Sequence, residues 1–181
     1  MLVTACPARG PGPETALREH AWAERLEAEG LGNLHRVSED LYRGKQPGRE
    51  GFETLARMGV RTVINLRTGH GDEEDLEELG LGYVHIPMRA DDFTDADVAR
   101  FLEVVSDERN LPVFVHCLHG ADRTGLVCGA YRVVVQGWSR EEAAAEMTQG
   151  GFGYHRVWKK PVQWLETFDV QALKRMAGIT K

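Results

Sequence analysis

Cysteine is scarce in this chain, and its three cysteines lie too far apart to build a covalent or metal-bound framework. Cys6, Cys117 and Cys128 are too few for the dense disulfide pattern of small secreted domains, and no C-x-x-C pair offers a structural zinc site. Because the number is odd, at least one thiol stays free unless it pairs between chains. Cys117 lies in a loop rich in histidine and glycine, and is therefore a candidate nucleophile.

The sequence also lacks a long hydrophobic run and an excess of positive charge. No stretch approaches the roughly 18 apolar residues that predict a membrane helix, and the formal net charge is -6. We therefore expect no stable membrane span and no nucleic-acid partner, because a negative chain repels polyanions. The length of 181 residues, with 42% hydrophobic and 28% charged residues, fits one globular domain. Any anion must be bound by a local site.

The first residues have no secretory signal, since they lack a basic region and a long apolar core. Their prolines and glycines predict a flexible leader over residues 1–13, and the protein as written is expected in the cytoplasm. The run Leu2-Val3-Thr4-Ala5-Cys6 nevertheless resembles the end of a bacterial lipoprotein signal. If upstream residues are missing, the alternative is a periplasmic or lipid-anchored protein modified at Cys6.

Strand-like and helix-like segments alternate over the rest of the chain. β-Branched and apolar runs predict strands at residues 41–43, 62–66, 83–86 and 112–115. Apolar spacing, capping residues and terminating glycines predict helices at residues 14–29, 52–58, 72–79, from 94 onward, 123–136, 139–148 and 157–176. Ser139 and Glu142 form a predicted capping box. The alternation predicts an α/β fold, with residues 14–181 as one domain around a central, mostly parallel sheet flanked by helices.

The last predicted strand runs directly into a loop that can bind an anion and then into a helix. The loop reads His116-Cys117-Leu118-His119-Gly120-Ala121-Asp122-Arg123-Thr124. A helix N-terminus offers unpaired N–H groups and the positive end of the helix dipole, which suit a tetrahedral oxyanion. Gly120 lets the loop turn tightly, and Arg123 can grip two phosphate oxygens with its planar guanidinium. We expect residues 118–123 to bind the phosphate group.

The same field favours an ionised sulfur. A cysteine at a helix N-terminus beside cations can have its pKa lowered to roughly 3.5–7.5, so Cys117 is the predicted nucleophile. His116 is expected to hold the loop through its ring, and Thr124 to offer its hydroxyl to the sulfur. His116, Cys117 and His119 do not predict a metal site, because adjacent ligands rarely converge on one ion and no fourth ligand is near. Cys128 is predicted to be a core residue.

These residues resemble a known family. The pattern of His116, Cys117, five residues, Arg123 and Thr124 is similar to the signature of the protein tyrosine phosphatases. The segments LYRGKQP (41–47), TVINLR (62–67) and IPM (86–88) resemble elements of its compact dual-specificity-like bacterial and fungal branch. The resemblance covers about residues 33–153. It implies a phosphocysteine intermediate, no metal or other cofactor, and a central sheet flanked by helices.

The resemblance also implies a general acid, normally an aspartate on a loop before the cysteine. Asp92 is the favoured candidate, with Asp91 and Asp122 as alternatives. Other polar residues near these motifs have plainer readings. Arg43 is interpreted as a surface cation or a residue flanking the pocket, and His155 as a loop residue with no identifiable partner.

The leading functional hypothesis is hydrolysis of phosphotyrosine, extended to phosphoserine and phosphothreonine, in a phosphorylated protein or a small phosphate ester. Phosphoinositide or inositol-phosphate hydrolysis is the alternative, although the loop lacks the lysines that polyanionic substrates favour. A rhodanese-like sulfurtransferase and an inactive phosphate-binding module are weaker readings. The intact Cys117 and Arg123 argue against the inactive module.

Overall fold

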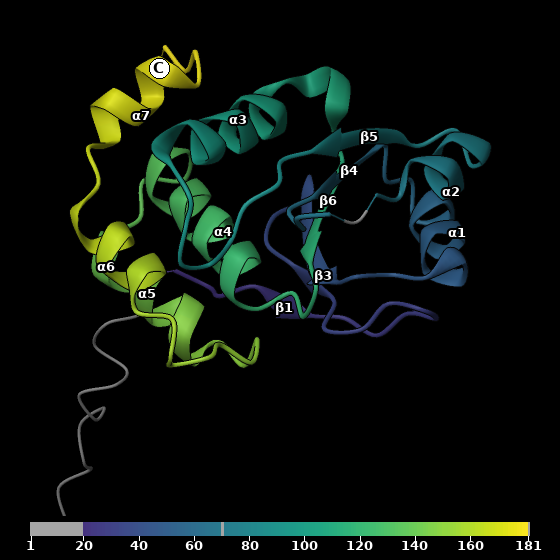
Figure 1. The fold of residues 1–181 in the computed structure, drawn as a ribbon, viewed down its shortest axis with the longest axis horizontal. Helices are drawn as coiled ribbons and strands as arrows, with labels where there is room; N and C mark the ends of the chain where they lie inside the picture. The colour runs from purple at the N-terminus through teal and green to yellow at the C-terminus, as the bar shows by residue number, and fades with distance from the viewer. Residues whose placement is uncertain (1–19, 70, 181) are drawn as a thin grey trace, which may run out of the picture.

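A six-stranded sheet forms the centre of the fold (Figure 1). The computed structural model describes residues 20–69 and 71–180. The strands run in the order β1-β2-β3-β6-β4-β5 across the sheet. Their bounds are Glu24–Arg25 (β1), His35–Arg36 (β2), Leu41–Lys45 (β3), Thr62–Asn65 (β4), Gly82–His85 (β5) and Val113–Cys117 (β6). The pairings between β3, β6, β4 and β5 are parallel and those of β1 and β2 are antiparallel, which confirms the predicted, mostly parallel sheet.

Helices cover both faces of the sheet (Figure 1). Two of them, α1 (Arg49–Arg57) and α2 (Glu73–Glu78), lie on one face. The other face carries α3 (Asp95–Ser106), α4 (Asp122–Val134), α5 (Arg140–Gln149), α6 (Lys160–Thr167) and α7 (Val170–Met176). Side chains alternate along a strand, so Phe114 packs in the core under α1 and α2 while Val113 and Val115 pack in the core on the opposite face. A fully buried β6 therefore separates two apolar cores.

Three parallel strands end together beneath the candidate loop. Lys45 of β3 pairs with Cys117 at the end of β6, and Asn65 of β4 pairs with His116. In open α/β sheets, ligands bind outside the carboxyl ends of such strands. The register therefore brings the segments that follow β3, β4 and β6 to one edge of the sheet.

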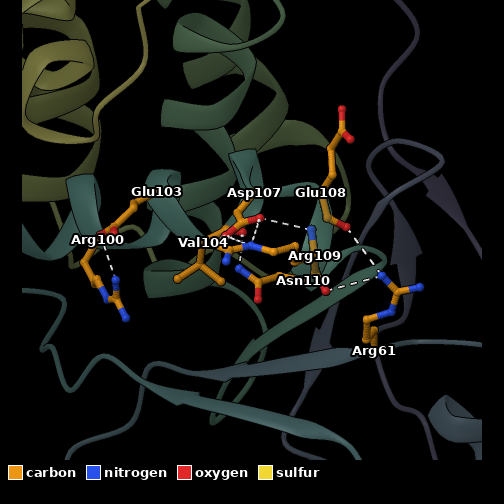
Figure 2. Close-up of polar contacts among 8 residues, drawn as sticks. All are labelled: Arg61, Arg100, Glu103, Val104, Asp107, Glu108, Arg109 and Asn110. Carbon is orange, nitrogen blue, oxygen red and sulfur yellow. Dashed lines mark hydrogen bonds and ion pairs between the residues drawn. The ribbon is translucent and has the colours of Figure 1, made fainter.

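The chain enters β6 through a turn that is tied to its neighbours by polar contacts (Figure 2). After α3, the short 3-10 helix Glu108–Asn110 is capped by Asp107, whose carboxylate pairs with Arg109 at 2.6 Å. This hydrogen-bonded pairing lowers the pKa of Asp107 to about 2. Arg61, just before β4, donates to the carbonyls of Glu108 and Arg109 at 3.4 and 3.3 Å. These contacts fix the start of β6 against β4.

The predicted helix over residues 14–29 is wrong for the part that the structure describes. Residues 24 and 25 form β1, and the preceding backbone is bonded to helix α5 instead of to itself. The N–H of His20 donates to Glu142 at 2.9 Å, and that of Ala23 donates to Glu146 at 2.7 Å. Carboxylates of a distant helix thus replace the helical hydrogen bonds. The predicted leader, with Cys6, lies outside the described residues, so both expectations about the compartment remain predictions.

The capping box at the start of α5 is only half formed. Ser139 accepts the backbone N–H of Glu142 at 3.1 Å, as predicted. The Glu142 side chain does not return to Ser139, because its oxygens bind the backbone and the ring of His20. The side chain that would close the box therefore fastens the N-terminal segment.

The single helix predicted over residues 157–176 is also wrong, because α6 and α7 are separate helices. Phe168 has the extended angles φ -60° and ψ 149°. Asp169 then caps α7, its Oδ1 accepting the N–H groups of Gln171 and Ala172 at 2.9 and 3.0 Å. An aspartate cap with an extended residue before it starts a new helix. In the described ranges, no helix is both long and apolar enough to cross a membrane.

Candidate active site

The predicted anion loop lies between β6 and α4, at the edge where the parallel strands end. Cys117 is the last residue of β6 and is 2% exposed, and Asp122 is the first residue of α4. The loop is thus attached to a strand buried along its whole length and to a helix whose residues are almost all buried. The loop is therefore anchored at both ends to buried elements of the core.

The carbonyl oxygens of residues 118–121 all accept hydrogen bonds from residues outside this segment. The donors are Gln46 N to Leu118 O at 3.4 Å, Asn33 Nδ2 to His119 O at 3.0 Å, Arg43 Nη2 to Gly120 O at 2.8 Å, and Gly125 N to Ala121 O at 2.7 Å. In a trans peptide, each N–H points opposite to the preceding C=O. The amides of residues 119–122 therefore turn to the other side of the loop, and that of Gly120 reaches the Cys117 sulfur. Main-chain donors thus line the cradle around the sulfur.

Arg43 is the residue that sequence reasoning missed in this support. Its side chain is 1% exposed, and its guanidinium lies 3.8 Å from the centre of the Phe152 ring while it binds the loop carbonyls. The interpretation as a surface or pocket-flanking cation is therefore wrong. Strand periodicity was the available signal, because Leu41 and Arg43 are two residues apart on β3 and must share a face; Leu41 is also 1% exposed.

Gly120 is required by its backbone and its surroundings. Its backbone φ is 70°, a value that residues with a side chain rarely adopt. An added Cβ would also lie 2.3 Å from the Gly44 carbonyl oxygen. The loop therefore packs directly on the backbone of β3. This close approach explains the glycine that the motif carries.

The surroundings of Cys117 favour its ionised form. Burial alone would raise the pKa of its thiol, but hydrogen bonds from the side chain and backbone of Thr124, the charge of Arg123 and the Gly120 amide outweigh burial. The pKa consequently lies below its ordinary value of 9.0. The Thr124 hydroxyl is fully buried, and its interaction with the Cys117 sulfur is one of the contributions that lower the pKa of that thiol.

His116 takes a different position from the one expected. Its ring is fully buried, and neither ring nitrogen makes a hydrogen bond to any described residue, so it does not hold the loop through its ring. Its Nε2 instead lies 3.3 Å from Oδ2 of Asp72. That carboxylate also accepts hydrogen bonds from Asn65 and Gln46, both at 2.6 Å. The histidine before Cys117 thus faces a buried, hydrogen-bonded carboxylate.

Arg123 lies in the first turn of α4 and lines a pocket of about 470 Å³ above the loop. Its Nη1 is 3.4 Å from the carbonyl of Leu66, directly after β4, and 3.3 Å from the carbonyl of Met88, shortly after β5. The pocket is also lined by Arg89, Asp91, Leu118, His119, Asp122, His155 and Trp158. The structure therefore brings together the predicted phosphate loop and part of the predicted acid loop.

The three aspartates proposed as general acid are placed differently. Asp91 lines the pocket, but both of its oxygens accept from Arg89 at 3.1 Å, and this pairing lowers the pKa of the Asp91 carboxyl. The favoured Asp92 is exposed and is not among the residues that line the pocket. Asp122 lines it too, with its carboxylate bonded to the backbone and ring of His155, both at 2.8 Å.

The chain is similar to known phosphatases over most of its length. Residues 22–161 match the family described as DSP-PTPase phosphatase fused to NAD+ kinase. The chain is 36% identical over 163 residues to the dual specificity protein phosphatase TpbA of Pseudomonas aeruginosa strain UCBPP-PA14, covering 89% of this chain and 73% of TpbA. It is 28% identical over 156 residues to the inositol diphosphatase DSP3 of Arabidopsis thaliana, covering 79% and 73%.

A solved structure of a phosphatase also resembles this chain. The crystal structure of a cysteine-to-serine variant of P. aeruginosa TpbA in complex with phosphotyrosine matches this chain with a TM-score of 0.77 at 33% identity. The match covers 89% of this chain and 98% of that one. The resemblance seen in the sequence is thereby confirmed, as is the predicted fold class. This chain belongs to the compact dual-specificity-like branch of the protein tyrosine phosphatase superfamily and is a phosphatase.

Proposed function

We propose that this phosphatase hydrolyses phosphotyrosine and related aryl phosphates through a phosphocysteine intermediate. The observation that supports the proposal most directly is the environment of Cys117. A thiol with a lowered pKa lies at the base of a loop whose carbonyl oxygens all accept hydrogen bonds from groups outside the loop. An ionised sulfur below a ring of amide donors is positioned for attack on a bound phosphorus atom.

The reaction follows from these positions. The Cys117 sulfur forms a bond to phosphorus while the ester oxygen leaves, and the loop amides with Arg123 hold the other phosphate oxygens. The leaving oxygen takes a proton, for which the sequence offers Asp92, Asp91 and Asp122. Water then attacks the phosphocysteine and gives its proton back to the group that protonated the leaving oxygen, the S–P bond breaks, and the Thr124 hydroxyl stabilises the thiolate as it leaves. The residues need no metal or cofactor for these steps.

The pocket rim favours an aromatic ester over a polyphosphate. Leu118 and Val157 are apolar yet 39% and 75% exposed, and they line the pocket beside Trp158, where they can contact a phenyl ring. The formally charged lining is balanced, with two arginines (Arg89, Arg123) against two aspartates (Asp91, Asp122). A highly phosphorylated inositol would gain little from such a lining. Phosphotyrosine, the ligand in the structure of the TpbA variant, is an aromatic phosphate ester and fits these features.

A comparison of substrates tests the proposal. Wild-type protein in the presence of a chelator is assayed on a phosphotyrosine peptide and on an inositol diphosphate. We expect turnover of the peptide, inhibition by vanadate, and loss of turnover in Cys117→Ser. The matched control is Cys128→Ala, since Cys128 is a buried core thiol whose pKa is raised by burial to about 11, and this variant should keep its activity.

Two results would overturn the proposal. Turnover retained by Cys117→Ser would show that the sulfur is not the nucleophile. A strong preference for the inositol diphosphate would show that the apolar rim does not select the substrate.

A further inference from the structure

Asp122 is paired with His155, a residue that has no part in the proposed reaction so far. The Asp122 side chain is 11% exposed, and its Oδ2 lies 2.8 Å from Nδ1 of His155, whereas its Oδ1 accepts the backbone N–H of the same residue. Two contacts from one carboxylate fix both the position of residue 155 and the orientation of its ring. The carboxylate therefore aligns the histidine as well as tethering the segment.

The second ring nitrogen of His155, Nε2, is not bonded to Asp122. Because Nδ1 is bonded to Asp122, Nε2 is the nitrogen that can exchange a proton with a bound group. The His155 side chain is 47% exposed and lines the same pocket as Arg123. A carboxylate on one imidazole nitrogen selects the tautomer and stabilises the imidazolium, as in hydrolases that pair aspartate with histidine.

The charged and titratable groups around His155 belong to the reaction site itself. Asp122 approaches from α4, the His119 ring lies 5.3 Å away between ring centres, and Arg123, Arg89 and Asp91 line the same pocket. The acid-loop carboxylates are less suited to give a proton. Asp91 is held by Arg89, and Asp92 is outside the pocket lining.

We propose that His155, aligned by Asp122, is the catalytic residue that carries the proton in both steps of the reaction. This inference rests on the proposed function, since it assigns a further residue to the same reaction. An imidazole suits this task because it changes charge between about pH 5 and 8.

The proton balance closes over one turnover. As Cys117 attacks and the P–O bond breaks, the His155 imidazolium gives the Nε2 proton to the leaving oxygen. The ester leaves as a neutral phenol and His155 becomes neutral. Water then attacks phosphorus, its proton passes to Nε2, and the S–P bond breaks with its electron pair returning to Cys117. Phosphate leaves, and thiolate and imidazolium are both restored.

The test varies the leaving group. Phenyl phosphate releases an oxygen with a pKa near 10, as tyrosine does, and needs an acid, whereas dinitrophenyl phosphate releases a stable anion without one. The variant His155→Asn keeps an N–H at the position of Nδ1 for Asp122 and removes the second nitrogen. We expect kcat/KM on phenyl phosphate to fall about 10²–10⁴-fold, with a much smaller loss on dinitrophenyl phosphate and no basic limb in the pH profile.

The controls separate catalysis from folding. His85→Asn replaces an exposed histidine bonded to the Arg67 carbonyl, outside the pocket lining, and should leave both rates unchanged. Turnover of dinitrophenyl phosphate itself reports that His155→Asn is folded. Equal losses on both substrates, no loss on either, or a leaving-group-selective loss in Asp91→Asn or Asp92→Asn in place of His155→Asn would each overturn the inference. Failure of the proposed function would show separately, as turnover by Cys117→Ser.

Discussion

Replacement of Arg43 tests how the phosphate loop is held in place. Arg43→Met removes a buried guanidinium that binds Gly120 O at 2.8 Å and Ala121 O at 3.4 Å and stacks on Phe152. A hydrogen bond from a charged donor contributes about 1.5–3 kcal/mol, and a cation–π contact about 0.5–2 kcal/mol. For the shorter bond, at 2.8 Å, together with the ring contact, the sum is about 2–5 kcal/mol. We expect the lower half of that range, because Asn33 Nδ2 lies 3.5 Å from Gly120 O and retains part of the support.

Stability and activity must be measured separately for this variant. Urea denaturation gives the free energy of unfolding, and turnover of an aryl phosphate by the folded protein gives kcat. We expect kcat to fall as well, because an unheld Gly120 carbonyl can turn and carry the next amide away from the phosphate. Arg43→Lys should lie between wild type and Arg43→Met, since lysine keeps the charge but not the planar stacking.

The matched control lies on the neighbouring strand. Arg36 pairs with Glu24, and both side chains are about half exposed. Arg36→Met should therefore change the free energy of unfolding by no more than about 0.5 kcal/mol. If Arg43→Met were as stable and as active as this control, the hydrogen bonds from Arg43 to the loop carbonyls would not be what shapes the loop.

Three further predictions follow from the contacts of the loop and of helix α4. Because the folded state lowers the pKa of Cys117, alkylation by iodoacetamide should stay fast below about pH 9. The stability that the thiolate contributes is fully present above its ordinary pKa of 9.0, declines as the pH falls below that value, and is gone below the lowered pKa. Gly120→Ala should abolish most turnover, because its Cβ would meet Gly44 O at 2.3 Å. Glu146→Ala should cost about 3–5 kcal/mol in urea denaturation, because it leaves the buried Arg132 without its 2.6 Å partner.

Each of these predictions has a result that would contradict it. Alkylation that slows already as the pH falls below about 9 would mean that the thiol keeps its ordinary pKa. Full activity in Gly120→Ala would mean that the loop can move away from Gly44. A Glu146→Ala variant as stable as wild type would mean that Arg132 finds other acceptors.

The elements that were predicted correctly carry local signals. The strand at residues 62–66 is a β-branched run, and Thr94 starts α3 with a capping box that is written in neighbouring residues. The phosphate loop is equally local, since Cys117 and Arg123 belong to one strand–loop–helix unit. Such features depend on side chains a few residues apart, which a single sequence displays directly.

The features that were missed depend on partners far along the chain. Arg43 meets Gly120 across 77 residues, and Asn33 meets His119 across 86. The pairing of His155 with Asp122 spans 33 residues, and the helix predicted near His20 is replaced by contacts with Glu142, 122 residues away. Helix propensity in residues 14–29 is a weak preference that such tertiary contacts override. By contrast, the break before α7 had a local signal in Asp169, a residue type that commonly begins a helix.

The hydrogen bonds that hold the carbonyls of residues 118–121 have a consequence for how the substrate preference of this enzyme can evolve. In the proposed reaction, backbone amides and Arg123 hold the phosphate group of the substrate, so the apolar side chains at the pocket rim take no part in bond breaking. Leu118 and Val157 project into solvent at the mouth of the pocket. Exchanges at these two positions can therefore alter which esters are accepted while the underlying chemistry persists, so preference and catalytic power can evolve along separate routes.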